Sequence, residues 1–347
     1  MVNSGLLPID GDEDNVGGNF LTFIVSAPQG CNLKCPFCVV RQRKEMTGDL
    51  LSPGDLVRFI REAAARASIY ALAIQGYEPL LPASREHTEA VLATGRSLDL
   101  PTALVTNGVL LRDAVHWLAP LAPTRIGISL DAASADAHDR IRGVPGAWAA
   151  TVDGIRHAGE VLAPRTSLVV ASVLTSHREP LDDMPKLLRS LGITHWIISP
   201  LQKIGRDRVG GPTGNRETLY RNLLTLQQAA DHAGIHLNID DELDCLRHDL
   251  AVARDPELGK LRVRTLPEGV DLFRLVPSGQ CSLNQDILRQ VTPDTARWRP
   301  GEMDAGEFIE GLKLSTGEFA HASFNRNGWR SSKTTLSTAH QIPAYHE

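Results

Sequence analysis

Three cysteines near the start of the chain have the types and spacing that most clearly indicate chemistry. Cys31, Cys35 and Cys38 fall within eight residues, whereas Cys245 and Cys281 are far away. Three thiolates can hold three corners of a metal site, but no histidine lies nearby to complete a closed tetrahedral zinc site. Fe–S clusters are normally held by four thiolates, so three would leave one iron open to a substrate or cofactor. The spacing favours such a cluster, with a zinc site or three unrelated buried thiols as the alternatives.

The segment that must position these cysteines alternates short apolar runs with stretches of helical periodicity. This alternation is typical of βα units around a parallel sheet. The predicted strands are 20–27, 70–75, 102–106, 125–130, 167–174 and 195–199. Six units of about 30 residues fit residues 20–206, whereas eight do not. We therefore predict an α/β fold, a partial (β/α)6 TIM-like barrel, with the cysteines directly after its first strand.

Further short motifs follow the predicted strands. They are Gln75-Gly76-Tyr77-Glu78-Pro79, Thr106-Asn107-Gly108, Ser129-Leu130-Asp131 and His138-Asp139-Arg140-Ile141-Arg142-Gly143. Each motif alone is ordinary turn chemistry. Together they fall at the carboxyl ends of strands, the rim at which βα barrels build their active sites.

The loop Cys-Asn-Leu-Lys-Cys-Pro-Phe-Cys and these motifs resemble the radical S-adenosylmethionine (SAM) enzymes over residues 20–206. The resemblance implies one [4Fe-4S] cluster, held by Cys31, Cys35 and Cys38, whose open iron binds the amino and carboxylate groups of SAM. It also implies that an electron from the cluster cleaves SAM to methionine and a 5'-deoxyadenosyl radical. The SAM-binding residues that it implies are Phe37 at the adenine, Gln75, Gly76, Tyr77 and Glu78 at the methionine amino group, Asn107, and Ser129, Asp131 and Arg142 near the ribose and carboxylate. Tyr77 stands where the family has a glycine.

Composition and charge limit the partners. The 347 residues include 36 Lys and Arg against 41 Asp and Glu, a net charge of −5. This balance gives no overall attraction to nucleic acid or anionic lipid. No apolar run approaches the roughly 18 residues of a membrane span, and Asp10, Asp12 and Glu13 stand where a signal peptide would be apolar. We expect a cytoplasmic protein without a nucleic-acid or membrane partner.

The predicted organisation has four parts: an N-terminal segment at 1–19, the barrel at 20–206, a C-terminal extension at 207–325 and a polar tail at 326–347. The extension is expected to hold a helix over 217–233, a strand over 236–239 and a hairpin that turns at 277–279. It faintly resembles the extension that holds auxiliary Fe–S clusters in radical SAM relatives, without that extension's cysteines. Cys245 and Cys281 are two thiols where a second cluster needs four, so we predict a single cluster.

A single cluster favours redox-neutral chemistry, because relatives that oxidise an alcohol or thiol commonly use the auxiliary cluster as the electron sink. We predict dehydration of a 1,2-diol on the sugar of a nucleoside-type natural-product intermediate, with a base that removes a hydroxyl proton. The candidates for this base are Lys203, Asp240 and Glu242. The candidates for binding a substrate carboxylate are Lys203, Arg206 and Arg142.

Other reactions remain open. Epimerisation would use Cys245 or Cys281 as a hydrogen-atom donor, and decarboxylation or alcohol dehydrogenation of a sugar or aminoglycoside are further alternatives. A peptide-modifying enzyme is disfavoured because 19 residues before the first predicted strand are too few for a recognition domain. A non-catalytic Fe–S protein would have no use for the motifs at 76–79 and 129–131. We expect a small sugar or nucleoside substrate and a reductant such as flavodoxin or ferredoxin.

Overall fold

The computed structural model describes residues 15–28, 30–38, 50–174, 181–200, 216–240, 256–264, 268–283 and 298–315. Several predicted residues lie outside these ranges, namely Lys203, Arg206, Glu242 and Cys245.

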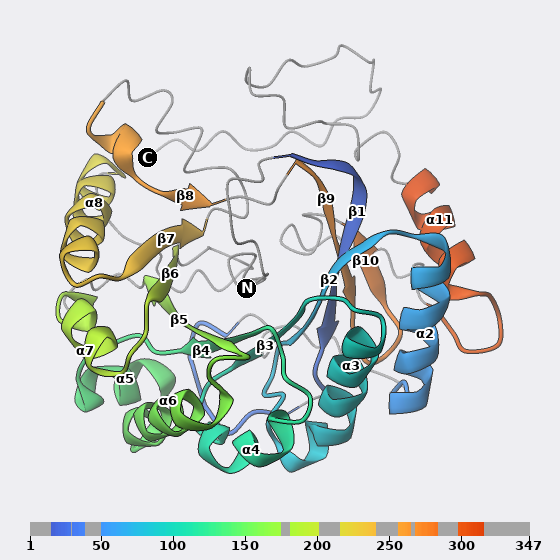
Figure 1. The fold of residues 1–347 in the computed structure, drawn as a ribbon, viewed down its shortest axis with the longest axis horizontal. Helices are drawn as coiled ribbons and strands as arrows, with labels where there is room; N and C mark the ends of the chain where they lie inside the picture. The colour runs from blue at the N-terminus through green and yellow to red at the C-terminus, as the bar shows by residue number, and fades with distance from the viewer. Residues whose placement is uncertain are drawn as a thin grey trace.

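One curved sheet forms the centre of the described fold (Figure 1). Its strands are β1 (Asn15–Ser26), β2 (Ile69–Gln75), β3 (Thr102–Thr106), β4 (Arg125–Ser129), β5 (Ser167–Leu174), β6 (His195–Pro200), β7 (His236–Asp240), β8 (Val263–Arg264), β9 (Glu268–Leu275) and β10 (Cys281–Leu283). The order is β10-β9-β1-β2-β3-β4-β5-β6-β7-β8. All neighbouring pairs are parallel except β9 and β10. The predicted partial TIM-like barrel is confirmed.

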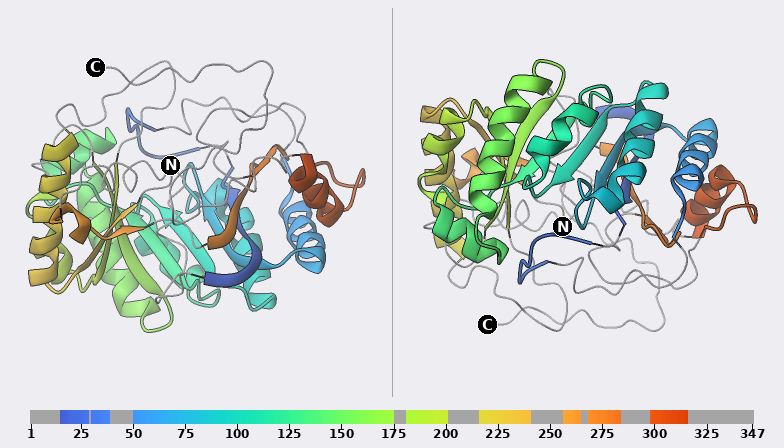
Figure 2. Two further views of the ribbon diagram at one scale, coloured as in Figure 1. Left: turned by 90° about the horizontal axis from the view of Figure 1, so that it is seen from above. Right: turned by 90° about the horizontal axis from the view of Figure 1, so that it is seen from below.

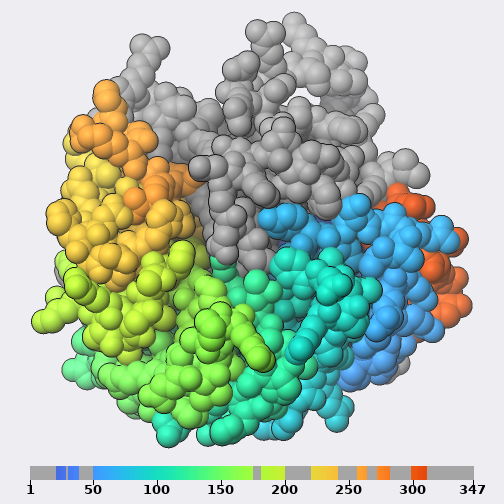
Figure 3. All heavy atoms as spheres, viewed as in Figure 1, coloured from blue at the N-terminus to red at the C-terminus, as the bar shows by residue number. Residues whose placement is uncertain are grey.

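Helices cover the outside of this arc of strands (Figures 1 and 2). They are α2 (Pro53–Arg66), α3 (Arg85–Ser97), α4 (Leu111–Leu118), α5 (Ala135–Arg142), α6 (Ala147–Leu162), α7 (Met184–Ser190), α8 (Arg216–His232) and α11 (Ala305–Ser315), with short 3-10 turns η2 (Pro82–Ser84) and η4 (Leu258–Lys260). The space-filling view shows the described side chains as the same arc, from α2 in blue to α8 in yellow (Figure 3). A capping motif explains where α2 begins, because Ser52 at the N-cap and Asp55 in the first turn form a reciprocal capping box.

The C-terminal region adds strands to both edges of this sheet. β7 and β8 extend it beyond β6, whereas β9 pairs in parallel with β1 and is followed by the antiparallel β10. The six strands predicted from the sequence form within two residues of their predicted bounds, apart from an earlier start of β1 at Asn15. The strand predicted at 236–239 and the turn at 277–279 also form. The parallel β1–β9 pairing was not predicted.

The two faces of the sheet differ in what they bury. The face toward the helices carries the main hydrophobic core, in which Phe23 and Phe273 pack against Phe59 of α2. The opposite face, here called the lumenal face, carries a small separate cluster drawn from strands alone: Ile24, Ala71, Ala73, Ala103 and Leu272. Because side chains alternate along a strand, membership of either cluster assigns the face of each neighbouring residue.

Candidate active site

The three-cysteine loop follows β1 at the carboxyl ends of the strands and packs on the motif His138–Gly143. The backbone N–H of Lys34 donates to the carbonyl of Arg142 at 3.0 Å. Gly143 has φ of 72°, and a Cβ at this position would lie 2.7 Å from the carbonyl oxygen of Lys34. Glycine is therefore required here both by conformation and by the close approach of the loop.

The cysteines have surroundings that fit an Fe–S cluster. Cys31, Cys35 and Cys38 are free, partly exposed thiols. The sulfur of Cys31 accepts from the Leu33 N–H at 3.4 Å and from the Asn107 amide at 3.7 Å. Burial raises the pKa of the Cys31 and Cys35 thiols above the ordinary 9.0, against the lowering effect of the Leu33 N–H on Cys31 and of Arg142 on Cys35. N–H donors to ligating sulfurs are among the features that tune Fe–S potentials.

A buried carboxylate ties the loop after β2 to the end of β3. Glu78 is fully buried and accepts hydrogen bonds from the hydroxyl of Thr106 at 2.6 Å, the N–H of Asn107 at 2.8 Å and the N–H of Leu80 at 3.0 Å. Burial raises the pKa of Glu78, while the three donors act in the opposite direction. The carboxylate is thus held by the protein, and it fixes Asn107, whose amide also donates to Asn32 at 2.6 Å.

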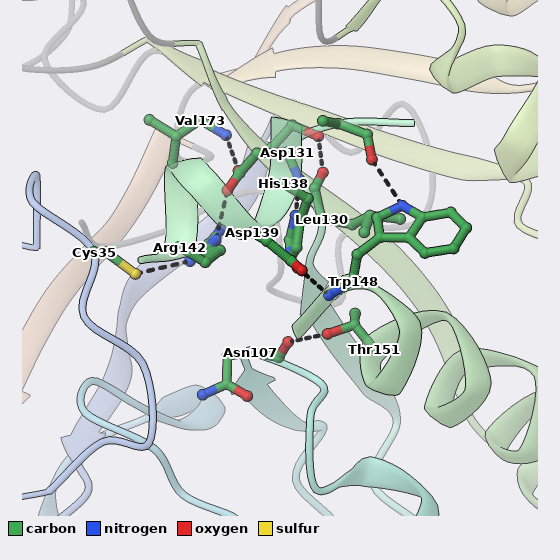
Figure 4. A network of polar contacts seen from close by, with 12 residues as sticks. Cys35, Asn107, Leu130, Asp131, His138, Asp139, Arg142, Trp148, Thr151 and Val173 are labelled. Atoms are coloured by element: carbon green, nitrogen blue, oxygen red, sulfur yellow. Dashed lines mark hydrogen bonds and ion pairs between the residues drawn. The ribbon is translucent and has the colours of Figure 1, made fainter. Parts of the chain in front are cut away.

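A buried ion pair joins the end of β4 to the cysteine loop (Figure 4). The Nε of Arg142 lies 2.5 Å from Oδ2 of Asp131, with side chains 9% and 0% exposed. Nη1 of Arg142 lies 3.8 Å from the sulfur of Cys35, and its guanidinium stacks over Phe37 at 5.7 Å. Burial opposes the charge on Arg142, but Asp131 and Cys35 raise its pKa above the ordinary value. Arg142 is therefore engaged with Asp131 and with the cysteine loop.

A second set of contacts fixes the backbone around Asp131. Oδ1 of Asp131 accepts from the N–H of Val173 at 2.9 Å, and Nδ1 of His138 accepts from the N–H of Asp131 at 3.1 Å. Since Nδ1 is the acceptor, His138 carries its proton on Nε2. Burial lowers the pKa of His138 to about 4, so the ring is neutral at pH 7. Ser172 donates to the carbonyl of Leu130 and in turn accepts from the indole N–H of Trp196.

The loop after β2 has backbone angles that few residues adopt. Gly76 and Tyr77 have φ of 79° and 45°. A side chain at φ above zero costs about 1 kcal/mol, so Tyr77 is strained where a glycine would not be. Strain of this kind occurs at ligand sites. Gln75 ends β2, is 4% exposed and shares the lumenal face with Ala73.

Two charged residues from the C-terminal strands reach the lumenal face at the carboxyl ends of the sheet. Asp240 ends β7, is 4% exposed and accepts from Ser199 at 3.4 Å. Its neighbour Ile239 belongs to the helix-facing core, so Asp240 points into the lumen. Arg274, 6% exposed, lies on β9 between the core residues Phe273 and Leu275 and donates from Nε to Ser26 at 3.1 Å.

Two further residues predicted from the sequence, Ser129 and Phe37, lie on the lumenal face and at the cysteine loop. Ser129 ends β4 and alternates with the core residue Ile128, which places it on the lumenal face. Phe37 packs with Val173, Cys35 and Ile141 at the cysteine loop. Arg274 was missed by sequence reasoning, although an arginine inside the apolar run 272–276 is a signal that could have found it.

Cys281 does not reach the lumen, which favours packing over the alternative in which it donates a hydrogen atom. It pairs with Leu275 across the β9–β10 ladder and belongs to the helix-facing core. Burial there raises the pKa of its thiol. A small apolar side chain would occupy the same space, so we assign Cys281 to packing.

A partial parallel barrel with a three-cysteine loop after its first strand defines the class of enzyme that uses an Fe–S cluster at the carboxyl rim. Within the described residues no group of three or more His, Cys, Asp or Glu is arranged to hold a single metal ion. Residues 25–191 match the radical SAM superfamily, so this segment is a radical SAM domain. Proteins of this superfamily use a [4Fe-4S] cluster and SAM.

Curated relatives match mainly in the same region. The chain is 33% identical over 181 residues to the AdoMet-dependent heme synthase of Methanosarcina barkeri, which covers 51% of this chain and 49% of that protein. It is 34% identical over 139 residues to the GTP 3',8-cyclase of Mycolicibacterium smegmatis, which covers 39% and 38%. The chain thus spans half or less of the length of these relatives.

A solved structure confirms the fold. Streptococcus suis SuiB, bound to its precursor peptide SuiA, aligns with a TM-score of 0.62 at 15% identity over 83% of this chain and 64% of that chain. At this identity the likeness shows the fold alone. Among the described helices, none is long and apolar enough to cross a membrane.

Proposed function

We propose that this radical SAM enzyme dehydrates a 1,2-diol on the sugar of a nucleoside-type intermediate, cytosylglucuronic acid of blasticidin S biosynthesis being the substrate we favour. The observation that carries the proposal is Asp240, a buried carboxylate on the lumenal face at the carboxyl end of β7. When bound, the cluster and SAM supply a radical that takes one hydrogen atom from a substrate carbon. Cys31, Cys35 and Cys38 would hold the cluster, and the loops at Gly76, Asn107 and Asp131 would hold SAM.

The proposed dehydration requires one side chain of the protein that first accepts a proton and then donates it. After a carbinol carbon has lost its hydrogen atom, the Asp240 carboxylate accepts the hydroxyl proton at that carbon. The same proton, returned to the neighbouring hydroxyl as its C–O bond breaks, lets that group leave as water. The α-keto radical then takes back the hydrogen atom that was removed from the substrate in the first step, so no external electron is consumed. The balance is a diol converted to a deoxy ketone and one water, with no net oxidation.

Two further observations support this choice. The sequence has five cysteines, three of them in the cluster loop, so two remain where a second cluster needs four, which favours redox-neutral chemistry. Cys281 lies in the helix-facing core, away from the lumen, which disfavours it as the hydrogen-atom donor of an epimerase. A nucleoside-type substrate agrees with the name of the curated relative GTP 3',8-cyclase, whose substrate is a nucleotide.

The test is anaerobic incubation of the reconstituted enzyme with SAM, dithionite and cytosylglucuronic acid, followed by mass analysis. We expect a product lighter by one water. Loss of two hydrogens, loss of carbon dioxide or an unchanged mass with inverted stereochemistry would assign dehydrogenation, decarboxylation or epimerisation instead. Asp240→Asn should abolish product while SAM cleavage continues. Asp231→Asn is the matched control, because Asp231 pairs with Arg262 outside the lumen.

Separate measurements test the cofactor content and the catalytic assignment. Reconstituted protein should contain about four irons and four sulfides per chain, and about eight of each would contradict a single cluster. Reductive SAM cleavage by the dithionite-reduced protein excludes a non-catalytic Fe–S role. Flavodoxin and ferredoxin are the proposed physiological reductants, and either should replace dithionite in this assay.

A further inference from the structure

Two side chains from outside the cysteine loop direct N–H groups at the sulfurs of the predicted cluster ligands. Nδ2 of Asn107, directly after β3, lies 3.7 Å from the sulfur of Cys31. Nη1 of Arg142, the last residue of α5, lies 3.8 Å from the sulfur of Cys35 (Figure 4). Both cysteines are free thiols, so their sulfurs are available as cluster ligands. The two donors thus come from different motifs and reach different sulfurs.

The guanidinium of Arg142 is held against the cysteine loop by several contacts. Its Nε donates to Oδ2 of Asp131 at 2.5 Å, and its Cζ lies 5.7 Å from the centroid of the Phe37 ring. The carbonyl of Arg142 accepts from the N–H of Lys34 at 3.0 Å, which ties its backbone to the same loop. The side chain is 9% exposed. Because water screens a buried charge weakly, this cation acts strongly on the adjacent sulfur.

The side-chain amide of Asn107 is also fixed in orientation. Its Oδ1 accepts from the N–H of Val109 at 3.0 Å, and its Nδ2 donates to Asn32 at 2.6 Å. Its backbone N–H donates to Glu78 at 2.8 Å, and its carbonyl accepts from the hydroxyl of Thr151 at 3.0 Å. Since Oδ1 accepts from a backbone donor, Nδ2 is the atom that faces the sulfur.

We propose that these two donors raise the reduction potential of the bound cluster. The reduced state of the cluster carries one more negative charge than the oxidised state, so a nearby cation and N–H groups on the sulfurs stabilise the reduced state more. Asp131 has the opposite charge and acts in the opposite direction. Its Oδ2 contacts Nε of Arg142, whereas Nη1 of Arg142 contacts the sulfur. This proposal concerns the cofactor and holds for any substrate.

The experiment is a potentiometric titration, followed by electron paramagnetic resonance, of the anaerobic, cluster-reconstituted full chain. Neither SAM nor substrate is present, because the family resemblance also assigns Arg142 and Asn107 to SAM. The measured quantity is the midpoint potential of the one-electron couple of the cluster, which requires no turnover. Iron and sulfide analysis establishes that each variant holds about four of each.

The variants separate charge from hydrogen bonding. Arg142→Gln keeps an N–H donor and loses the charge, whereas Arg142→Lys keeps the charge without the planar fork. Asp131→Asn removes the opposing carboxylate, and Asn107→Leu removes the amide donor. The matched control is Arg112→Gln, because Arg112 forms an exposed ion pair with Asp153.

We expect Arg142→Gln to lower the equilibrium constant for reduction about tenfold, which is a shift of about 59 mV to a more negative potential. Arg142→Lys should give a smaller shift because the charge remains. Asn107→Leu should lower the constant about two- to tenfold, the range for a neutral hydrogen bond. Asp131→Asn should move the potential in the positive direction, since it removes a negative charge and keeps the guanidinium. Arg112→Gln should leave the potential unchanged.

Opposite shifts for the two members of one ion pair distinguish an effect of charge from a loss of structure, because both variants break the pair. Shifts of the same sign in Arg142→Gln and Asp131→Asn would overturn the proposal. An unchanged potential in Arg142→Gln or Asn107→Leu would overturn it for that residue, and weaker SAM binding by the same variant would then assign the residue to SAM alone. If Arg142→Gln fails to hold four irons, Asp131→Asn and Asn107→Leu decide the question. Failure of the proposed dehydration would leave these potentials as they are, because no substrate takes part in the measurement.

Discussion

The hydrogen bond between Thr106 and Glu78 offers a quantitative test of how the site is held together. We consider Thr106→Val, which keeps the shape and β-branching of the side chain and removes its hydroxyl. The hydroxyl donates to Oε1 of Glu78 at 2.6 Å and accepts from the N–H of Gly108 at 3.1 Å. A lost hydrogen bond to a charged group costs about 1.5–3 kcal/mol, and a lost neutral one about 1 kcal/mol. Both partners are buried, so we expect destabilisation of about 3 kcal/mol.

The measurement is equilibrium urea unfolding of reconstituted protein under anaerobic conditions, with equal m-values as the condition for comparison. Thr22→Val is the matched control. Thr22 is fully buried on β1, and its hydroxyl has no hydrogen-bond partner among the described residues. Replacing an unbonded buried hydroxyl by a methyl group should be neutral or stabilising by about 1 kcal/mol. If Thr106→Val lowers the free energy of unfolding by less than about 0.5 kcal/mol, or by no more than Thr22→Val does, the hydrogen bonds of Glu78 do not tie the loop after β2 to the end of β3 as described above.

Further predictions concern the ion pair, the buried histidine and the C-terminal helix, all measured by urea unfolding. Arg142→Met should cost about 3–5 kcal/mol by stranding Asp131, and addition of Asp131→Asn should recover part of this; a cost below 1 kcal/mol would contradict the pairing. His138 has its pKa lowered from 6.5 to about 4, so its contribution is complete above pH 6.5 and about 3 kcal/mol is lost as pH falls to 4. His138→Asn keeps an acceptor for the backbone and should reduce this pH dependence, whereas an unchanged profile would assign it to other groups. In Gly306→Ala the new Cβ would lie 2.4–2.9 Å from the side chain of Arg66 on α2, so we expect the free energy of unfolding to fall by about 1–3 kcal/mol. Gly159→Ala, in open space on α6, should raise it by about 0.5–1 kcal/mol. Equal effects of the two variants would contradict the close packing of α11 on α2.

The sequence predicted the local elements of the fold because their signals are local. The cap at Ser52 and the apolar spacing that follows it determine where α2 begins and which face it buries. The pairing of β9 with β1 could not be predicted in this way. Leu272 and Arg274 show the alternation of a strand, but the partner of that strand lies about 250 residues earlier in the chain. Alternation indicates a strand and does not specify its neighbour.

The site was predictable to the extent that short motifs carry it. Cys31, Cys35 and Cys38 are recognisable by spacing alone, whereas the joining of Arg142 to Asp131 depends on how α5 returns over the end of β4. The face that Cys281 occupies is likewise set by the β9–β10 register and not by its own neighbours in sequence.

The described residues at the carboxyl ends of the sheet come from two separate parts of the sequence. The cysteine loop, the hydrogen-bonded Glu78 and the Asp131–Arg142 pair all come from residues 25–191, the radical SAM domain. Asp240 and Arg274 come from β7 and β9, which extend opposite edges of the six-stranded unit and lie on opposite sides of the arc (Figure 1). The charged lumenal residues of the C-terminal strands are therefore separate in sequence from the residues around the cysteine loop, although both sets lie at the carboxyl ends of one sheet, the rim at which βα barrels build their active sites.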